Sequence, residues 1–269
     1  MGSSNTWLSQ LGHYAAYLIQ YSPLLHSMVS NELKGKLKYT TLGYIWHLIN
    51  PLTLIVIYYT IFTVIFGKDV RDYWVYVSAG MFAFSFMQSC IFSGSSCIIN
   101  NKNLVTKMAF PRELLIFSKI IATSITLVVS YVLLTILMVA SGVYISWTII
   151  YMPLIVILMS VFTAGLVLMI ASISVYVRDL PYAVHLIMGC LMFAIPIMYL
   201  PSQRYTPLMD YIWHANPFYY YIEAIHACFY WGTIPSQLDL VMCFVFTSLF
   251  FIIGMIVFKK LEKKFAERL

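Results

Sequence analysis

A short segment between residues 102 and 113 mixes basic and apolar side chains in a way that suits binding to a soluble protein. The apolar residues could insert into a groove on the partner, and the basic residues could contact acidic groups at its rim. Pro111, Arg112 and Glu113 would then end the segment and begin the next helix. The side chains that give the segment this character are Lys102, Leu104, Val105, Lys107, Phe110 and Arg112.

The sequence offers little for covalent chemistry. It contains no G-x-x-x-x-G-K-[ST] loop, so we expect this chain not to cradle a nucleotide by itself. The five cysteines show no C-x-x-C pairing and the six histidines no metal-ligand spacing, which favours a packing role for both. The sequence also shows no nucleophile motif and no cluster of aspartates. We therefore expect no catalytic residue, no metal and no bound cofactor.

Long stretches without Asp, Glu, Lys or Arg decide the class of protein. They are 39–67, 73–101, 120–177, 182–203 and 240–258. A helix needs roughly 20 apolar residues to cross a hydrocarbon core about 30 Å thick, and the longest stretch has room for two such helices. Hydrophobic residues make up 61% and charged residues 10% of the chain, too few charges for the surface of a soluble fold. We predict an all-α polytopic membrane protein with six transmembrane helices, near 42–66, 74–99, 117–141, 148–176, 182–200 and 238–258.

The basic residues fall almost entirely on one side of this arrangement. With both termini in the cytoplasm, Lys68, Arg71 and Arg204 lie outside and the other thirteen of the 16 lysines and arginines lie inside. Cytoplasmic loops of membrane proteins carry such an excess, so the split supports this orientation. It also explains the net charge of +6 without a nucleic-acid partner. Lys102 and Lys119 fit this topological role alone.

No ionisable residue lies deep inside a predicted span. Ion-driven transporters, pumps and voltage sensors place such residues within the membrane, so the sequence argues against these classes. A membrane pathway that also lacks a phosphate-binding loop indicates a scaffold driven by a partner.

Three regions follow from this topology: an N-terminal cytoplasmic and interfacial segment 1–38, the transmembrane domain 39–258 and a basic cytoplasmic tail 259–269. In the first region, Ser22-Pro23 predicts a helix start. Apolar residues then recur at helical spacing, which predicts an amphipathic helix lying in the membrane interface. They are Leu25, Met28, Leu33 and Leu37.

The external segment 201–237 is apolar and aromatic, yet its apolar runs are too short to span. Asn216-Pro217 predicts a helix start within it. We interpret the segment as a re-entrant helical hairpin between spans five and six that dips into the outer leaflet, with Glu223 as its one partly buried charge. An amphipathic external helix is the alternative.

Four segments resemble the permease subunit of polysaccharide ABC exporters, the type-2 ABC exporters of O-antigen, capsule and teichoic acid chains. The resemblance extends over about residues 30–258, and its most specific part is Asn103 to Glu113 in the first cytoplasmic loop. The other matching segments are Thr41 to Leu52, Tyr176 to Leu180, and Asn216-Pro217 with Glu223.

The resemblance implies a homodimer of permeases that works with two copies of a separate cytoplasmic ATPase, which would hold the ATP and Mg. The expected cargo is a lipid-linked polysaccharide, most specifically O-antigen on a polyprenyl diphosphate carrier, moved across the bacterial inner membrane. The residues that would couple to the ATPase are Leu104, Val105, Lys107, Phe110, Arg112 and Glu113. Those that would form the external gate are Trp213, Asn216, Pro217 and Glu223.

A polysaccharide needs a lined pathway, because each unpaired hydroxyl placed in hydrocarbon costs about 4–8 kcal/mol. Aromatic faces can stack on sugar rings and let them slide. We predict a channel lining of Tyr58, Tyr59, Phe62, Phe193 and Tyr199, although interfacial or core packing would also explain each of them.

Three lysines precede the first span, at the cytoplasmic entry: Lys34, Lys36 and Lys38. They could attract the phosphate of the lipid carrier, or equally the bulk anionic lipid of the membrane. Two other functions stay open: an exporter of drugs or small lipids on the same plan, and an integral-membrane transferase acting on lipid-linked sugars. The short outer loop 67–73 favours glycan cargo, and the lack of clustered acidic or histidine residues counts against the transferase.

Overall fold

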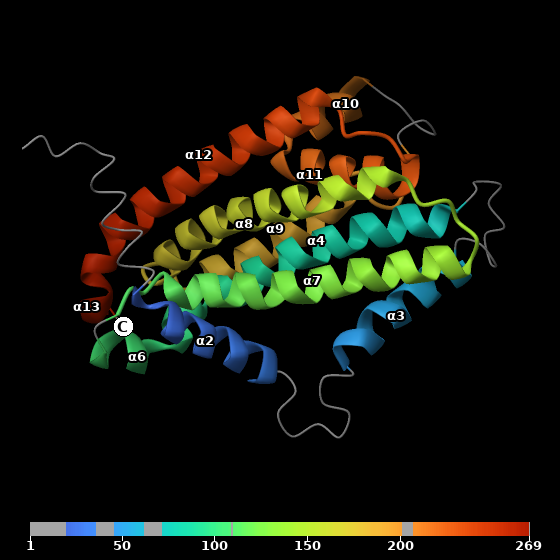
Figure 1. The fold of residues 1–269 in the computed structure, drawn as a ribbon. Helices are drawn as coiled ribbons and strands as arrows, with labels where there is room; N and C mark the ends of the chain where they lie inside the picture. Colours follow the sequence, from blue (N-terminus) through green and yellow to red (C-terminus); the bar gives the residue numbers. More distant parts are fainter. Residues whose placement is uncertain (1–19, 36–45, 62–71, 109, 201–206, 269) are drawn as a thin grey trace, which may run out of the picture.

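The computed structural model describes residues 20–35, 46–61, 72–108, 110–200 and 207–268, and every regular element in these ranges is a helix (Figure 1). Long helices run side by side and give the bundle an elongated shape. The predicted all-α class is therefore confirmed.

Four helices in the described ranges are long and apolar enough to cross a membrane. They are α4 (Tyr73–Ser95), α7 (Leu114–Ala140), α8 (Met152–Ser174), which continues the 3-10 helix η3 (Trp147–Tyr151), and α12 (Gln237–Leu261). They match the second, third, fourth and sixth predicted spans. Each contains at least 23 residues, enough to cover roughly 30 Å at 1.5 Å per residue.

Within the described residues, the helices at the first and fifth predicted spans are shorter. These are α3 (Trp46–Tyr59), with 14 residues, and α9 (Leu180–Ala194), with 15. Helix α9 is only about 22 Å long. It ends because Ile195 is extended (φ −116°, ψ 141°) before Pro196, and a proline ring disfavours helical backbone at the residue before it. The six-span topology therefore remains a prediction at these two positions.

Helix α2 (Ser22–Gly35) begins at Ser22, as the sequence predicts. Its Leu25 and Leu33 side chains face Ile121 and Ile125 of α7 across a shallow groove, and Asn31 is exposed. The helix therefore turns an apolar side toward α7 and a polar side away from it. Its placement in a membrane interface remains a prediction.

The closest helix contact is between α8 and α12, where two glycines meet. A Cβ atom at Gly254 would come within 2.2 Å of the Gly165 carbonyl oxygen, and one at Gly165 within 2.4 Å of the Phe250 carbonyl oxygen. Small residues let membrane helices approach to backbone contact, where dispersion forces hold them together. The two helices therefore pack as one unit.

We expect Gly254→Ala to destabilise the protein by roughly 1–3 kcal/mol, because the added methyl group meets backbone that has no room to move. The matched control is Gly189→Ala on α9, where a Cβ atom meets nothing within 4 Å. The control should unfold at the same temperature as the unchanged chain or somewhat higher, since alanine favours a helix. Thermal unfolding in detergent, followed by gel filtration, measures both. Equal stability of the two variants would contradict this packing.

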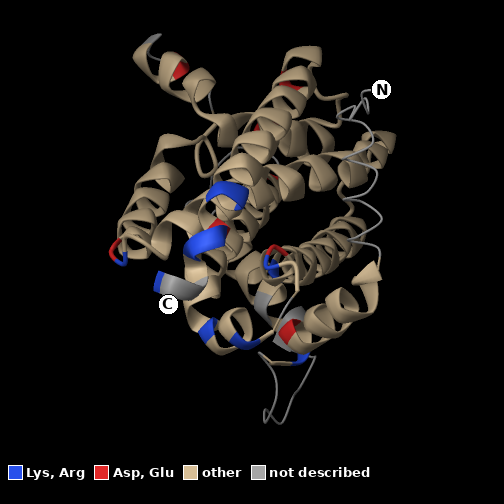
Figure 2. Ribbon diagram, turned by 90° about the vertical axis from the view of Figure 1, so that its left-hand side faces the viewer, with Lys and Arg blue, Asp and Glu red and all other residues tan. Residues whose placement is uncertain are grey.

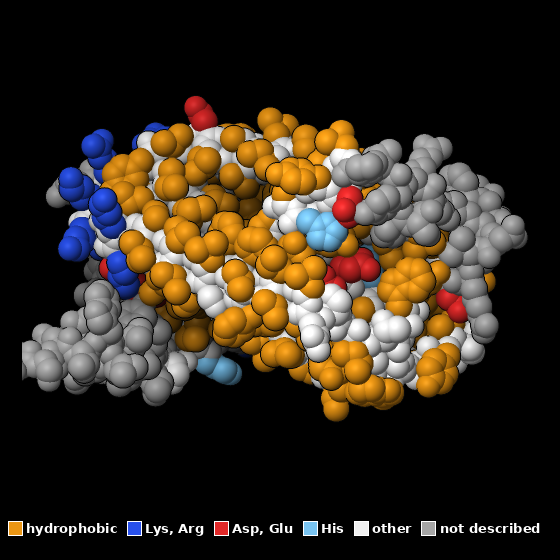
Figure 3. Space-filling view, turned by 90° about the horizontal axis from the view of Figure 1, so that it is seen from above, with side chains coloured by type: hydrophobic (Ala, Val, Ile, Leu, Met, Phe, Trp, Pro, Cys, Tyr) orange, Lys and Arg blue, Asp and Glu red, His pale blue; other side chains and the backbone are white. Residues whose placement is uncertain are grey.

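Basic residues gather at one end of the bundle in the ribbon of Figure 2, and their side chains do so in the space-filling view of Figure 3. Helix α6 (Lys102–Lys107) and the C-terminal helices lie at that end, whereas α10 (Pro207–Ala215) and α11 (Pro217–His226) lie at the other (Figure 1). This asymmetry agrees with the division of charge expected from the sequence. Which end faces the cytoplasm remains a prediction.

Candidate functional site

The predicted docking segment begins with the short helix α6 at the basic end, directly after the four-residue helix α5 (Cys97–Asn100). Val105 points inward and is buried, whereas Leu104 is 38% and Met108 55% exposed. Lys107 is also exposed, in the last turn of α6. The outer side of α6 therefore presents apolar and basic groups together. Such a surface suits a soluble partner.

The end of this segment is held inside the molecule. Glu113 is completely buried, and its Oε1 lies 2.9 Å from Lys259 Nζ. Arg112 donates a hydrogen bond to the Glu262 carbonyl oxygen, and its guanidinium lies 6.0 Å from the ring centre of Phe265. Arg112 and Glu113 thus contact the end of the chain. Phe110, before them, is half-buried against the core.

Breaking a fully buried ion pair by removing one partner costs about 3–5 kcal/mol. The cost here should be smaller, because the Lys259 side chain is 39% exposed and water can reach it. The pair still fixes a carboxylate that has no access to solvent. Its role is to hold the start of α7 to the end of α12.

Sequence reasoning missed the residues on the other side of this contact, which are Lys259, Glu262 and Phe265. The charges of this segment predict only a basic cytoplasmic tail. A signal was present, since Phe258, Leu261 and Phe265 recur at helical spacing between the charges. Both phenylalanines are fully buried, with ring centres 5.7 Å apart.

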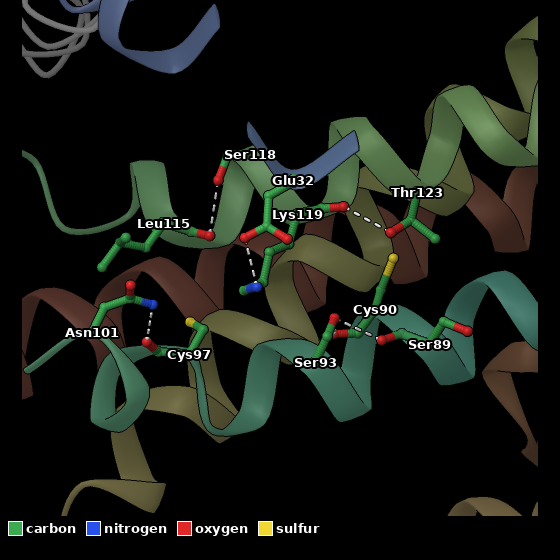
Figure 4. Close-up of polar contacts among 10 residues, drawn as sticks. All are labelled: Glu32, Ser89, Cys90, Ser93, Cys97, Asn101, Leu115, Ser118, Lys119 and Thr123. Carbon is green, nitrogen blue, oxygen red and sulfur yellow. Dashed lines mark hydrogen bonds and ion pairs between the residues drawn. The ribbon is translucent and has the colours of Figure 1, made fainter. Parts of the chain in front are cut away.

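Of the predicted entry lysines, Lys34 lies exposed in the last turn of α2, whereas Lys36 and Lys38 fall outside the described residues. The same helix carries Glu32, whose carboxylate lies 2.7 Å from Lys119 Nζ on α7 (Figure 4). Lys119 therefore has a structural contact beyond the topological role expected from the sequence. The ion pair joins α2 to the bundle.

The predicted channel aromatics differ in their surroundings. Tyr58 is buried in a small cluster with Tyr73 and Tyr76, whereas Tyr59 is 44% exposed and Phe193 74% exposed. Tyr199 is half-buried and donates a hydrogen bond to the Phe193 carbonyl oxygen (3.2 Å). Phe62 lies outside the described residues. Of this set, Tyr59 and Phe193 are the most available to a ligand or a partner.

The predicted outer hairpin consists of α10 and α11, followed by the π-helix η5 (Ala227–Trp231). Asn216 caps α11 through a hydrogen bond that Oδ1 accepts from Phe218 N (3.1 Å), with Pro217 in the first turn, so the predicted helix start is confirmed. Trp213 is buried. Whether the segment enters a membrane remains a prediction.

A buried histidine lies beside the predicted gate acid. His226 is completely buried, and its Nδ1 lies 3.6 Å from a Glu223 carboxylate oxygen. Its ring stacks on Tyr76 with ring centres 3.7 Å apart, against Gly80, where a Cβ atom would come within 2.5 Å of Nε2. Glu223, the predicted partly buried charge of this segment, therefore has a histidine on its own helix as a neighbour.

An all-helical bundle with four membrane-length apolar helices and one basic end is the architecture of a multi-pass membrane protein. Within the described ranges, no group of three His, Cys, Asp or Glu side chains is arranged to hold a metal ion.

The comparisons with known proteins agree with this class. The model of the ABC-2 type transporter family matches residues 23–230, most of the chain. The chain therefore belongs to the ABC-2 type transporter family.

Three curated relatives are similar over nearly their full length. An O-antigen export system permease protein RfbA of Myxococcus xanthus is 26% identical over 251 residues, which cover 93% of this chain and 96% of that protein. Two proteins of the same name from Klebsiella pneumoniae are 26% and 24% identical over 245 residues, which cover 91% of this chain and 94% of each relative.

Proposed function

We propose that this chain is the membrane-spanning permease of an ATP-driven exporter of lipid-linked polysaccharide, with O-antigen on a polyprenyl diphosphate as its specific cargo. The observation that carries the proposal is the similarity over more than nine-tenths of the chain to relatives named O-antigen export permeases. Membership of the ABC-2 transporter family supports the ATP-driven part. The membrane would be the bacterial inner membrane, with both termini in the cytoplasm.

In this proposal the energy comes from a separate ATPase bound at the basic end. The exposed side of α6, with Leu104, Met108 and Lys107, supports such a docking surface. Two ATPase copies would work with two permeases, and Lys34 would attract the phosphates of the lipid carrier.

The pathway would lie between two copies of the chain, beside α9. Only Val184 and Met188 of this helix are buried within the described chain, whereas Leu186 and Phe193 are about three-quarters exposed. This free surface supports a second copy, or a cargo, as its neighbour. Tyr59 and Phe193 would contact passing sugar rings, and the hairpin of α10 and α11 would close the outer end.

We expect the double variant Tyr59→Ala/Phe193→Ala to reduce polymer export roughly fivefold to a hundredfold while the protein still assembles. Each aromatic contact is worth about 0.5–1.5 kcal/mol, and 1.4 kcal/mol corresponds to a factor of ten. Tyr144→Ala is the control, since Tyr144 is 81% exposed and lies before η3. Polymer at the cell surface, quantified by gel electrophoresis, gives the readout. Export equal to that of the control would mean that the two aromatic side chains do not line the pathway and only pack against the protein.

The proposed function is tested by depleting the chain in its own bacterium. We expect surface polysaccharide to disappear and lipid-linked polymer to accumulate on the cytoplasmic side, because synthesis continues while export stops. Normal surface polysaccharide in depleted cells would contradict the proposal.

A further inference from the structure

The end of the chain contacts both loops at the basic end of the bundle. Lys259, at the end of α12, pairs with the buried Glu113, and Arg112 donates to the Glu262 carbonyl oxygen. From the other loop, Tyr176 donates its hydroxyl to the Leu261 carbonyl oxygen (3.1 Å). A single segment therefore joins the docking loop, the loop between α8 and α9, and the last long helix.

These contacts hold a turn and a short helix against the C-terminus of α12. After α12 the chain makes the 3-10 turn η6 (Glu262–Lys264) and the short helix α13 (Phe265–Arg268). Arg112 and Tyr176 bond to carbonyl groups at the C-terminus of α12, where a helix offers unsatisfied acceptors and partial negative charge. The buried ring of Phe265 fills the space beside Arg112, and Arg268 lies 5.9 Å from the ring centre of Tyr176.

Beyond this C-terminal segment, α12 contacts α8 and α11 on its way to the opposite end of the molecule. Its Gly254 meets α8 at backbone contact. Further along, the Thr247 hydroxyl lies 2.7 Å from the hydroxyl of Tyr221 on α11 and donates to the Leu158 carbonyl oxygen of α8 (3.1 Å). A displacement of the docking loop that moves α12 would therefore also move α11.

We propose that the C-terminal segment 259–268 is a coupling element, in which Lys259, Arg112 and Tyr176 are positioning residues that fix the docking loop to α12. Movement of α6 by the ATPase then reaches α12, and through it the hairpin at the far end. This inference rests on the proposed function for the identity of the driving partner. It differs from a purely stabilising role, because it predicts loss of coupling while the complex stays assembled.

The test uses the full chain with its ATPase in proteoliposomes. Lys259→Met keeps the length of the side chain and removes its charge, and Lys260→Met is the matched control at an exposed neighbour. We expect Lys259→Met to keep ATPase binding and ATP hydrolysis within about twofold of the unchanged complex, and to lower the glycan exported per ATP at least about fivefold. Lys259→Arg, which keeps a positive charge beside Glu113 and Glu262, should retain at least half of that ratio. An unchanged ratio in Lys259→Met would overturn the inference, and so would a ratio in Lys259→Arg as low as that in Lys259→Met.

A second readout needs no cargo and so separates this inference from the proposed function. Tyr211→Cys, on the exposed side of α10, is introduced into a Cys190→Ser background, since Cys190 is the one free cysteine exposed within the described ranges. ATP should change the rate of maleimide labelling at this position at least about twofold in the unchanged complex and in Lys260→Met, and should not change it in Lys259→Met. If Lys259→Met fails to assemble, Tyr176→Phe, which loses only its bond to the Leu261 carbonyl, replaces it. Two results would overturn the inference: an ATP response in these variants equal to that of the unchanged complex, or no ATP response in the unchanged complex. Both results hold whatever the cargo is, because the labelling needs no cargo.

Discussion

Ile222→Asp is expected to prevent assembly of the protein. Ile222 is completely buried in α11, which packs against α4, α8 and α12. An unpaired carboxylate placed there costs several kcal/mol, a large part of the roughly 5–15 kcal/mol by which a folded protein is typically stable. We expect less than about a tenth of the normal yield of monodisperse protein after gel filtration in detergent.

Two matched variants make this result specific. Ile222→Val removes one methylene and should cost only about 0.5–1.5 kcal/mol, so the protein should still assemble. Glu223→Gln, at the next residue, should also assemble but should alter opening of the outer end, because it removes the charge 3.6 Å from His226. Normal yield of Ile222→Asp would mean that α11 does not pack where the structure shows it.

Charge reversal on the docking segment should abolish export in two distinguishable ways. Lys107 is exposed on α6, so Lys107→Glu should weaken binding of the ATPase at least about tenfold, since like charges opposed at an interface cost several kcal/mol. Arg112 contacts Glu262 and Phe265 inside the molecule, so Arg112→Glu should leave the ATPase bound and stop export. Co-purification of the two subunits and export by the intact complex measure the two effects separately.

The control for both reversals is Lys264→Glu, an exposed residue in η6. It should bind the ATPase and export as the unchanged chain does. A Lys107→Glu/Arg112→Glu variant that still co-purifies with its ATPase and exports normally would refute the docking role of this segment.

Local signals in the sequence predicted the parts of the fold that depend on neighbouring residues. Asn216 caps α11 with Pro217 in its first turn, and Ser22 and Pro23 are the first residues of α2. Such residues favour the start of a helix wherever they occur in a sequence. The uncharged stretches matched four membrane-length helices because this signal also depends only on consecutive residues. A helix in lipid must satisfy its own backbone and be apolar along its length.

Contacts between distant segments were not predictable in this way. Glu113 and Lys259 are 146 residues apart, and nothing in the sequence near either indicates the other. The early end of α9 was a different case, since Ile195-Pro196 was a readable break inside the predicted span 182–200. His226 was passed over because scattered histidines are ordinary, and only the structure brings it to Tyr76 and Glu223.

The most direct test of the central claim is transport by the purified complex. The chain is reconstituted into proteoliposomes with its separate ATPase, polyprenyl-diphosphate-linked polysaccharide is supplied on the ATPase side, and the polymer that becomes protected on the other side is measured after ATP is added. We predict ATP-dependent translocation that requires both subunits, with no ATP hydrolysis by this chain alone, since it lacks a phosphate-binding loop. ATP hydrolysis by the isolated chain, or hydrolysis by the complete complex with no polymer moved, would contradict the account.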